Sequence, residues 1–386
     1  MTIPQQLFSR FALIGQDLSL KQNVRLTIEH GRISNIETNA LKIGTEKNFT
    51  FNHHLLLPKF INSHVHIGDA ALKDQAFNMS LNQAVGKAGH KYEIKNLSKS
   101  QRMDAMRLAI IEMIKNGISA FYDFREGGLN GIQELKEAAS NLPIDLHILG
   151  RPDASSNLNN VLSNCDGLGL ATPLQFSKEE MIEIRKHAFL RKSIIATHIG
   201  EENQVIEEAL AKFGLNDLQL ALEYLDPNIL IHLTVLNEND LKKIPSSKFI
   251  VFCPRSNAYF GIGFPPVNYF LDKDHLLGLG TDNVMISSPN VLEELKWLIL
   301  RLKEQNISIN PYQALRLITT NPAEALQLST GCIKIGFWAD LLVLNLKSCR
   351  TSFGTDPILT LIFRSHLPDD CQLNLFHGEI ISDDFI

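Results

Sequence analysis

The chain has 386 residues, of which 44% are apolar and 20% are charged, and its net charge is -5 at pH 7. This composition is typical of a globular protein and excludes an intrinsically disordered chain. The net charge is mildly acidic, and the sequence contains no run of Lys and Arg. Binding to nucleic acid or to an anionic membrane is therefore not favoured. The expected partner is therefore a small molecule.

The five cysteines are scattered, and none of them is spaced Cys-x-x-Cys. We therefore expect reduced thiols and, by default, a cytoplasmic location. No segment approaches the roughly 20 uninterrupted apolar residues of a membrane span, and the first ten residues lack the pattern of a signal peptide. We expect no membrane association, and the oligomeric state stays open, with a homo-oligomer among the alternatives.

Both ends of the chain carry strand patterns. Alternating apolar residues precede a turn at His30-Gly31 near the start of the chain, and a similar pattern surrounds His377-Gly378 near its end. An isolated hairpin is at best marginally stable in water. We therefore expect residues 1–57 and 330–386 to pack together as one small β-sandwich domain.

The part between them, residues 58–329, alternates short apolar strands with helices, as parallel α/β proteins do. Helix-start signals separate several strands: Ser177 to Glu180 has the pattern of a capping box, and Asn310-Pro311 and Asn321-Pro322 that of a cap followed by the first helical residue. Eight such units favour a (β/α)8 TIM-type barrel over a doubly wound sheet. The expected strand ends are His66, Asp123, Gly150, Thr172, His198, His232, Cys253 and Asp282.

Several of these strand ends carry metal-binding residue types. His64 and His66 are two apart, so they share one face of a strand, and His198, His232 and Asp282 close three later strands. Each histidine alone is more often a buried residue bonded to a backbone carbonyl. In a barrel, however, all the strand ends meet on one face, and imidazole and carboxylate ligands suit Zn²⁺ or Fe²⁺.

At this point the chain resembles the metal-dependent aminohydrolase branch of the amidohydrolase superfamily, which includes nucleobase and nucleoside deaminases and chlorohydrolases. The matching motifs run from Pro58 to His66, Thr197 to Glu201, Cys253 to Asn257, Gly280 to Asn283 and Thr319 to Ala325, with His232 between them. The resemblance implies that His64, His66, His198 and Asp282 are metal ligands. It also implies that Glu201, His232 and Asp282 handle protons.

The sequence departs from the family pattern at Lys59, where Gly is usual. The candidate third and fourth strands also contain no Lys that could become a carbamylated bridge between two metals. We therefore expect one divalent transition metal, with Zn²⁺ favoured and Fe²⁺ as the alternative.

Polar residues near the strand ends are candidates for substrate binding: Arg125, Glu126, Arg151, Arg255, His90 and Asn283. A guanidinium suits a carboxylate or phosphate group, but an ion-pair network among these residues is an equal alternative. The long segment 69–98 after the first strand is either a lid over the site or a plain insertion.

The resemblance implies a hydrolase that attacks a non-peptide C–N bond with metal-activated hydroxide. We expect hydrolytic deamination of a cyclic amidine, such as a nucleobase, a nucleoside or a related heterocycle. The alternatives are a cyclic-amide or imidazolone hydrolase, a chlorohydrolase, and a catalytically silent binding barrel. The six intact residues of the implied site argue against the silent barrel.

Overall fold

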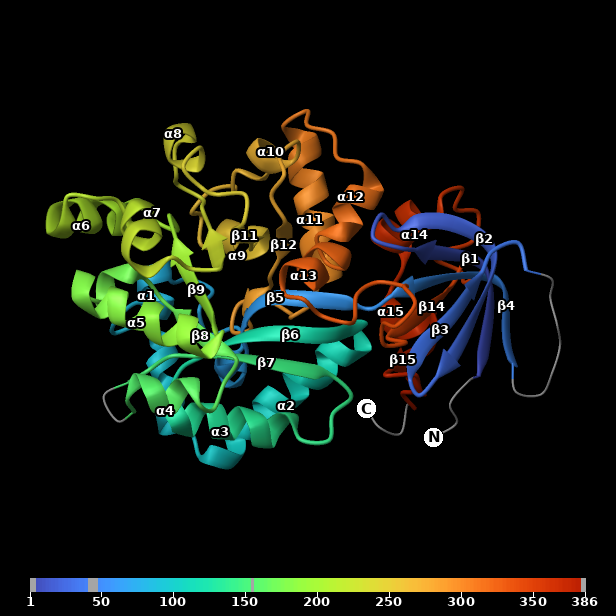
Figure 1. Ribbon diagram of the computed structural model, residues 1–386, viewed down its shortest axis with the longest axis horizontal. Coiled ribbons are helices and arrows are strands. Elements are labelled where there is room, and N and C mark those ends of the chain that lie inside the picture. Colours follow the sequence, from blue (N-terminus) through green and yellow to red (C-terminus); the bar gives the residue numbers. More distant parts are fainter. Residues whose placement is uncertain (1–4, 41–47, 154–155, 383–386) are drawn as a thin grey trace.

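The computed structural model describes residues 5–40, 48–153 and 156–382. Two β-structures lie side by side in it: a large parallel barrel with helices around it, and a smaller sheet made from both ends of the chain (Figure 1). This arrangement confirms the expected (β/α)8 barrel with a small sandwich.

The barrel consists of eight parallel strands, the last of which is broken into two short pieces, β12 and β13. β12 pairs with β11, whereas β13 pairs with the first barrel strand, β5, through Asp282 opposite Val65 and Asn283 opposite His66. The broken strand therefore closes the barrel. The bounds are β5 Phe60–His66, β6 Ile118–Arg125, β7 Asp145–Gly150, β8 Gly167–Leu170, β9 Ile194–Ile199, β10 Ile229–His232, β11 Phe249–Phe252, β12 Leu277–Leu279 and β13 Asp282–Asn283.

The break in the last strand lies at Gly280 and Thr281. A Cβ atom on Gly280 would come within 2.5 Å of the His64 Cβ atom, so only glycine lets this strand pass so close to β5. Directly after the break, Asp282 adopts a positive φ of 55°. Close passage and the turn of the backbone together bring Asp282 beside the histidines of β5.

Helices connect the barrel strands and cover the outside of the barrel (Figure 1). The serine capping box predicted at Ser177 and Glu180 is present at the start of α5. The α-helices of the barrel part are α1 Leu81–Val85, α2 Lys99–Lys115, α3 Gly128–Ala139, α4 Leu158–Leu162, α5 Lys178–Arg191, α6 Asn203–Phe213, α7 Asp217–Leu220, α8 Glu238–Leu241, α9 Pro254–Tyr259, α10 Val267–Phe270, α11 Val291–Glu304, α12 Pro311–Arg316 and α13 Thr320–Ala325. Shorter helical turns are η1 Ile67–Leu72, η2 His90–Asn96, η3 Pro173–Gln175 and η4 Ala221–Leu225.

One helix start differs from the prediction. Asn310 caps α12 as expected, with its side chain bonded to the Tyr312 amide, but Asn321 does not cap α13. That helix begins at Thr320, and the Asn321 side chain donates instead to the Leu277 carbonyl at 3.1 Å. The tertiary contact with β12 therefore prevails over the local capping preference.

The smaller sheet contains seven strands in the order β16-β15-β14-β4-β1-β2-β3. Its first half comes from the start of the chain and its second half from the end, so strands far apart in sequence pair where β14 meets β4. The bounds are β1 Gln6–Ile14, β2 Ser19–Glu29, β3 Arg32–Glu37, β4 Asn48–Pro58, β14 Leu341–Asn345, β15 Cys371–Phe376 and β16 Glu379–Ile380, with α14 Pro357–Arg364 and α15 Leu367–Asp370 between β14 and β15.

Two tight turns shape this sheet, and both were predicted. His30 and Gly31 have φ values of 50° and 76°, and His377 and Gly378 have values of 48° and 78°. Two positive φ angles in succession give the twist that a two-residue hairpin needs, and glycine at the second position adopts them without strain. The Ala339 amide donates to the Gly31 carbonyl, so the two halves of the sheet fold over a shared core.

A single apolar core joins the sandwich to the barrel. Leu13 and Leu342 from the sandwich belong to the same buried cluster as Phe60 and Met106 of the barrel part. The sandwich therefore packs directly against the barrel. Among the helices of the described residues, none has the length and apolar character needed to cross a bilayer.

Candidate metal centre and substrate pocket

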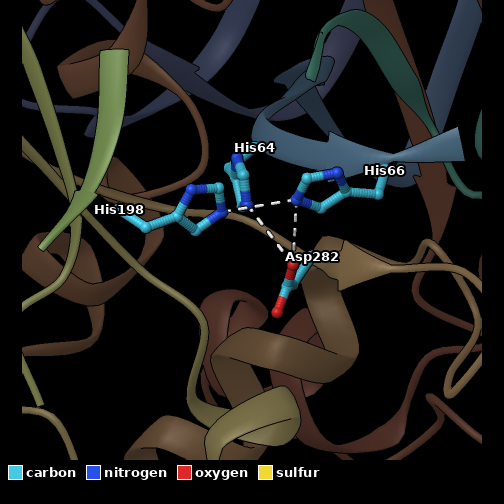
Figure 2. A group of neighbouring side chains, drawn as sticks. All are labelled: His64, His66, His198 and Asp282. Atoms are coloured by element: carbon cyan, nitrogen blue, oxygen red, sulfur yellow. Dashed lines mark hydrogen bonds and ion pairs between the residues drawn. The ribbon is translucent and has the colours of Figure 1, made fainter. Parts of the chain in front are cut away.

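Four side chains from three regions of the barrel converge at the ends of their strands. His64 and His66 come from β5, His198 from β9 and Asp282 from β13, and Figure 2 shows them pointing toward one another. One ligand atom from each lies within 4.8 Å of the others. We call these residues the His/Asp cluster.

The ring nitrogens of the cluster face one another closely. Nε2 of His66 lies 3.3 Å from Nε2 of His198, and Nε2 of His64 lies 3.3 Å from Oδ1 of Asp282. His198 Nδ1 lies 3.0 Å from the Leu170 carbonyl oxygen, which can only accept, so Nδ1 carries the proton and Nε2 presents a lone pair to the cluster.

His64 provides a direct test of whether the cluster fits a metal. Its side chain is fully buried, and neither ring nitrogen forms a well-aligned hydrogen bond among the described residues, although Nε2 faces Asp282 Oδ1 at 3.3 Å. Buried polar atoms without such bonds are costly and call for an explanation. For Nε2, a divalent cation shared by three imidazoles and one carboxylate supplies it, because this donor set and number match a catalytic zinc or iron site.

The electrostatics of the cluster keep its histidines neutral, which is the form that binds metals. Burial and the neighbouring His64 lower the pKa of His66 to about 3. Burial is also the main cause that lowers the pKa of His64 and that of His198.

Glu201 and His232 lie beside the cluster. Glu201 follows β9, and its Oε1 atom lies 3.4 Å from Nε2 of His232 at the end of β10. His232 is fully buried, whereas the Glu201 side chain is 21% exposed. Burial raises the pKa of Glu201 to about 7, although His232 opposes this shift. Glu201 can therefore hold or release a proton near neutral pH.

The backbone at two of these positions is strained. His232 has φ 75° and the following Leu233 has φ 58°, and Asp282 lies in the same left-handed region. Positive φ angles at residues other than glycine cost free energy and are often found at functional sites. Ser256 also restrains Asp282, because its hydroxyl donates to Oδ2 at 2.5 Å and leaves Oδ1 facing the histidines.

A cavity of about 510 Å³ opens onto the His/Asp cluster. Its lining includes His66, His198, Glu201 and Asp282, together with residues of the long segment after β5. This volume lies within the range of small-molecule sites. The cavity therefore brings a substrate to the cluster and to the Glu201 carboxyl group.

Three charged residues form a network in the wall of this pocket. Oε1 of Glu126 accepts both from Lys91 Nζ at 2.7 Å and from Arg151 Nη1 at 2.5 Å. Burial alone would raise the pKa of Glu126, but Arg151 and Lys91 outweigh it and lower that pKa to about 2. The glutamate thus stays ionised and holds both cations.

The six substrate-binding candidates fall into two groups. Glu126, Arg151 and Asn283 line the pocket, and Asn283 donates to Asp69 Oδ2 at 2.7 Å. The other three do not line it. Arg255 pairs with the buried Glu294 at 2.6 Å, which is the ion-pair alternative, Arg125 contacts Met106 and the Glu126 carbonyl, and His90 contacts Gln75.

Sequence reasoning missed three residues that the structure brings to this region. Lys91 and Asp69 line the pocket from the segment after β5, and Asn257 contacts His232 from the start of α9. No local pattern marks the first two. Asn257 lies in a motif that the sequence did single out, and its position just after β11 was the available signal.

Comparison with known proteins agrees with this architecture. A model described as the amidohydrolase family matches residues 55–372. The chain belongs to the amidohydrolase family. The match covers the barrel and extends into the second half of the sandwich sheet, so the fold and the matched motifs agree.

Two relatives and one solved structure illustrate the range of similarity. The chain is 31% identical over 392 residues to an uncharacterised protein of Methanocaldococcus jannaschii, with 95% of this chain and 97% of the relative covered. It is 26% identical to a 5-methylthioadenosine/S-adenosylhomocysteine deaminase of Pyrococcus furiosus, with 92% and 89% covered. A crystal structure of an adenosine deaminase from Xanthomonas campestris with bound zinc superimposes with a TM-score of 0.83 at 18% identity and covers 97% and 92%.

These findings support a deaminase-like hydrolase of carbon–nitrogen bonds. They establish the reaction class more firmly than the substrate. The relative from Pyrococcus is named for small heterocyclic substrates, whereas the fold alone is shared with the Xanthomonas structure.

Proposed function

We propose that this enzyme catalyses the hydrolytic deamination of a cyclic amidine, with a nucleoside or nucleobase as the substrate class. One observation carries the proposal: a metal-binding donor set and the Glu201–His232 pair lie together at a substrate-sized cavity. A deaminase needs this combination, since water must be activated and the amino group must be protonated before it leaves as ammonia.

We propose one divalent transition metal held by His64, His66, His198 and Asp282. A divalent metal at such a site lowers the pKa of water from about 15.7 toward about 7. Zinc is the first candidate because the Xanthomonas structure contains it, and iron is the alternative. Elemental analysis of the purified enzyme should find about one equivalent per chain. Two tightly held equivalents would contradict the proposed single site.

The chain's own residues divide the proton transfers between them. His232 and Asp282 accept the proton that the attacking water gives up, and Glu201 protonates the ring nitrogen next to the attacked carbon. The raised pKa of Glu201 suits this task, because a general acid works best when its pKa lies near the operating pH. The proton accepted from water then passes to the amino group, which leaves as ammonia, while the hydroxyl on the attacked carbon returns a proton to Glu201 and becomes the carbonyl of the product.

The deciding experiment is a panel of heterocyclic amines scored for ammonia release. 5-Methylthioadenosine, S-adenosylhomocysteine and adenosine come first because they are named in the relatives, followed by guanine and cytosine. Ammonia release that disappears with a chelator and returns with Zn²⁺ or Fe²⁺ would support the proposal. Turnover of cyclic amides or chlorinated triazines without ammonia release would favour the two other hydrolase classes.

A further inference from the structure

Asn257 is a fully buried residue in the first turn of α9, and its side chain contacts the proposed base. Its Oδ1 atom lies 3.1 Å from Nδ1 of His232. Its Nδ2 group donates to Oγ1 of Thr234 at 2.6 Å. Both ends of the amide are therefore engaged, one by His232 and the other by a residue two positions further along the same loop.

The direction of the amide determines where His232 carries its proton. An amide oxygen can only accept, so the ring atom that faces it, Nδ1, must carry the hydrogen. Nε2 of the neutral ring is then left with a lone pair. Nε2 has no hydrogen-bond partner among the described residues, and it faces the Glu201 carboxyl group at 3.4 Å.

We propose that Asn257, whose amide oxygen lies against Nδ1, is a positioning residue that fixes His232 in the tautomer with a free Nε2. This inference rests on the proposed function, because it takes His232 to accept a proton during the reaction. A reversed amide would place an N–H group against Nδ1 and move the ring proton to Nε2. The base would then be blocked without any change in the shape of the site.

Two substitutions of Asn257 separate an acceptor from a donor at this position. Asn257→Leu removes the partner of Nδ1, and turnover should fall roughly 10–100-fold, as is usual when such a supporting partner is lost. Asn257→Asp keeps an oxygen acceptor for Nδ1 but removes the amide N–H donor, so its turnover should stay much closer to wild type than that of Asn257→Leu. KM and the bound metal should stay near wild type in both. Equal losses in the Leu and Asp variants would overturn the proposal.

A matched control accounts for the loss of a buried hydrogen bond as such. The buried hydroxyl groups of Ser119 and Thr330 lie 2.9 Å apart. Ser119 is at the start of β6, whereas the His/Asp cluster lies where the barrel strands end. Ser119→Ala should lower thermal stability and leave kcat near wild type. If its kcat fell as much as that of Asn257→Leu, the effect would be general destabilisation and the proposal would fail.

A direct readout does not depend on any substrate. Nitrogen chemical shifts of the metal-loaded enzyme, with His232 assigned by loss of its signals in His232→Gln, report which ring nitrogen carries the proton. We expect the proton on Nδ1. A proton on Nε2 would overturn the inference, whereas a missing deaminase activity with the proton on Nδ1 would count against the proposed function alone.

Discussion

Glu201 is the residue whose protonation most directly bears on the proposed reaction. The carboxyl group lies against His232 at the pocket that reaches the His/Asp cluster. An alternative structural role as an ion-pair partner of Arg151 or Arg255 finds no support in the described contacts, because those arginines bind Glu126 and Glu294. Proton transfer therefore remains the role that the geometry favours.

Glu201→Gln should retain the metal and bind substrate but lose turnover by a factor on the order of 10²–10⁴, the usual contribution of a general acid or base. Steady-state kinetics and elemental analysis measure both quantities. Glu202→Gln is the control from the same loop and should lose far less. His198→Ala should instead lose the metal itself. If Glu201→Gln were also metal-free, its lost turnover would follow from the missing metal, and the assignment of Glu201 to proton transfer would be refuted.

At single positions, the sequence indicated where the histidines lie better than where the arginine side chains point, and the reason is geometric. A histidine at the end of a barrel strand is placed by the strand, and its short side chain leaves little choice of direction. An arginine such as Arg255 has a long side chain whose direction depends on an acid from a distant helix, here Glu294 of α11. No local pattern in the sequence contains that information.

Among the elements, the start of helix α5 shows that local chemistry suffices at an exposed helix end. The Glu180 amide donates to Ser177 Oγ at 3.2 Å, and the Ser177 amide donates to Glu180 Oε2 at 2.7 Å. Ser177→Ala should therefore lower the free energy of unfolding by about 1 kcal/mol. Chemical denaturation measures this loss, and kcat should not change. Glu180→Gln preserves the capping box and serves as the control.

The segment after β5 lines the pocket, and Lys91 attaches it to the barrel. The Lys91 side chain is 10% exposed and pairs with Glu126, which follows β6. Lys91→Met keeps the length of the side chain but removes this attachment. The segment should then open more readily, so KM should rise more than kcat falls, and proteolysis between residues 73 and 90 should speed up.

The exposed Lys87 lines the same pocket from the same segment, so Lys87→Met is the matched control. It should leave the rate of proteolysis close to that of the wild type. Equal proteolysis and KM for Lys91→Met and wild type would mean that residues 69–98 are a plain insertion rather than a lid.

At the scale of the whole molecule, the barrel and the sandwich followed from the order of strand and helix patterns. The broken eighth strand did not, because its closure depends on the approach of Gly280 to His64 from the opposite end of the sequence. The exact division between the two domains, at residues 57 and 330, stays a prediction. Their shared core, with Leu13 and Leu342 buried beside Phe60, explains why a boundary is hard to infer from sequence alone.

Polar groups also link the two parts of the molecule. His377, in the turn between β15 and β16, lies 3.3 Å from Asp145 at the start of barrel strand β7, and its amide donates to Asp340 at 2.6 Å. Lys59 is fully buried near the same carboxylates. Burial lowers its pKa to about 8, although Asp340 and Asp145 oppose this shift. This group of charges should make the contact between barrel and sandwich sensitive to pH.

The sign of this effect follows from His377. Burial alone would lower its pKa, but the hydrogen bond to Asp145 and the charge of Asp340 outweigh burial and raise the pKa above 6.5. A histidine whose pKa is raised by folding stabilises the protein fully below its unfolded pKa and loses this contribution as pH rises through the folded pKa. Both side chains of the pair are about one-third exposed, so the contribution should be at most roughly 1 kcal/mol.

His377→Gln should therefore lower the melting temperature relative to wild type by more at pH 5.5 than at pH 9. Thermal unfolding at the two pH values measures this difference. In the Asp145→Asn background most of the pH dependence should already be gone, so His377→Gln should then cause a similar shift at both values. If the wild-type and His377→Gln proteins differ by the same amount at both pH values while Asp145 is intact, the charge of His377 does not stabilise the contact between the barrel and the sandwich.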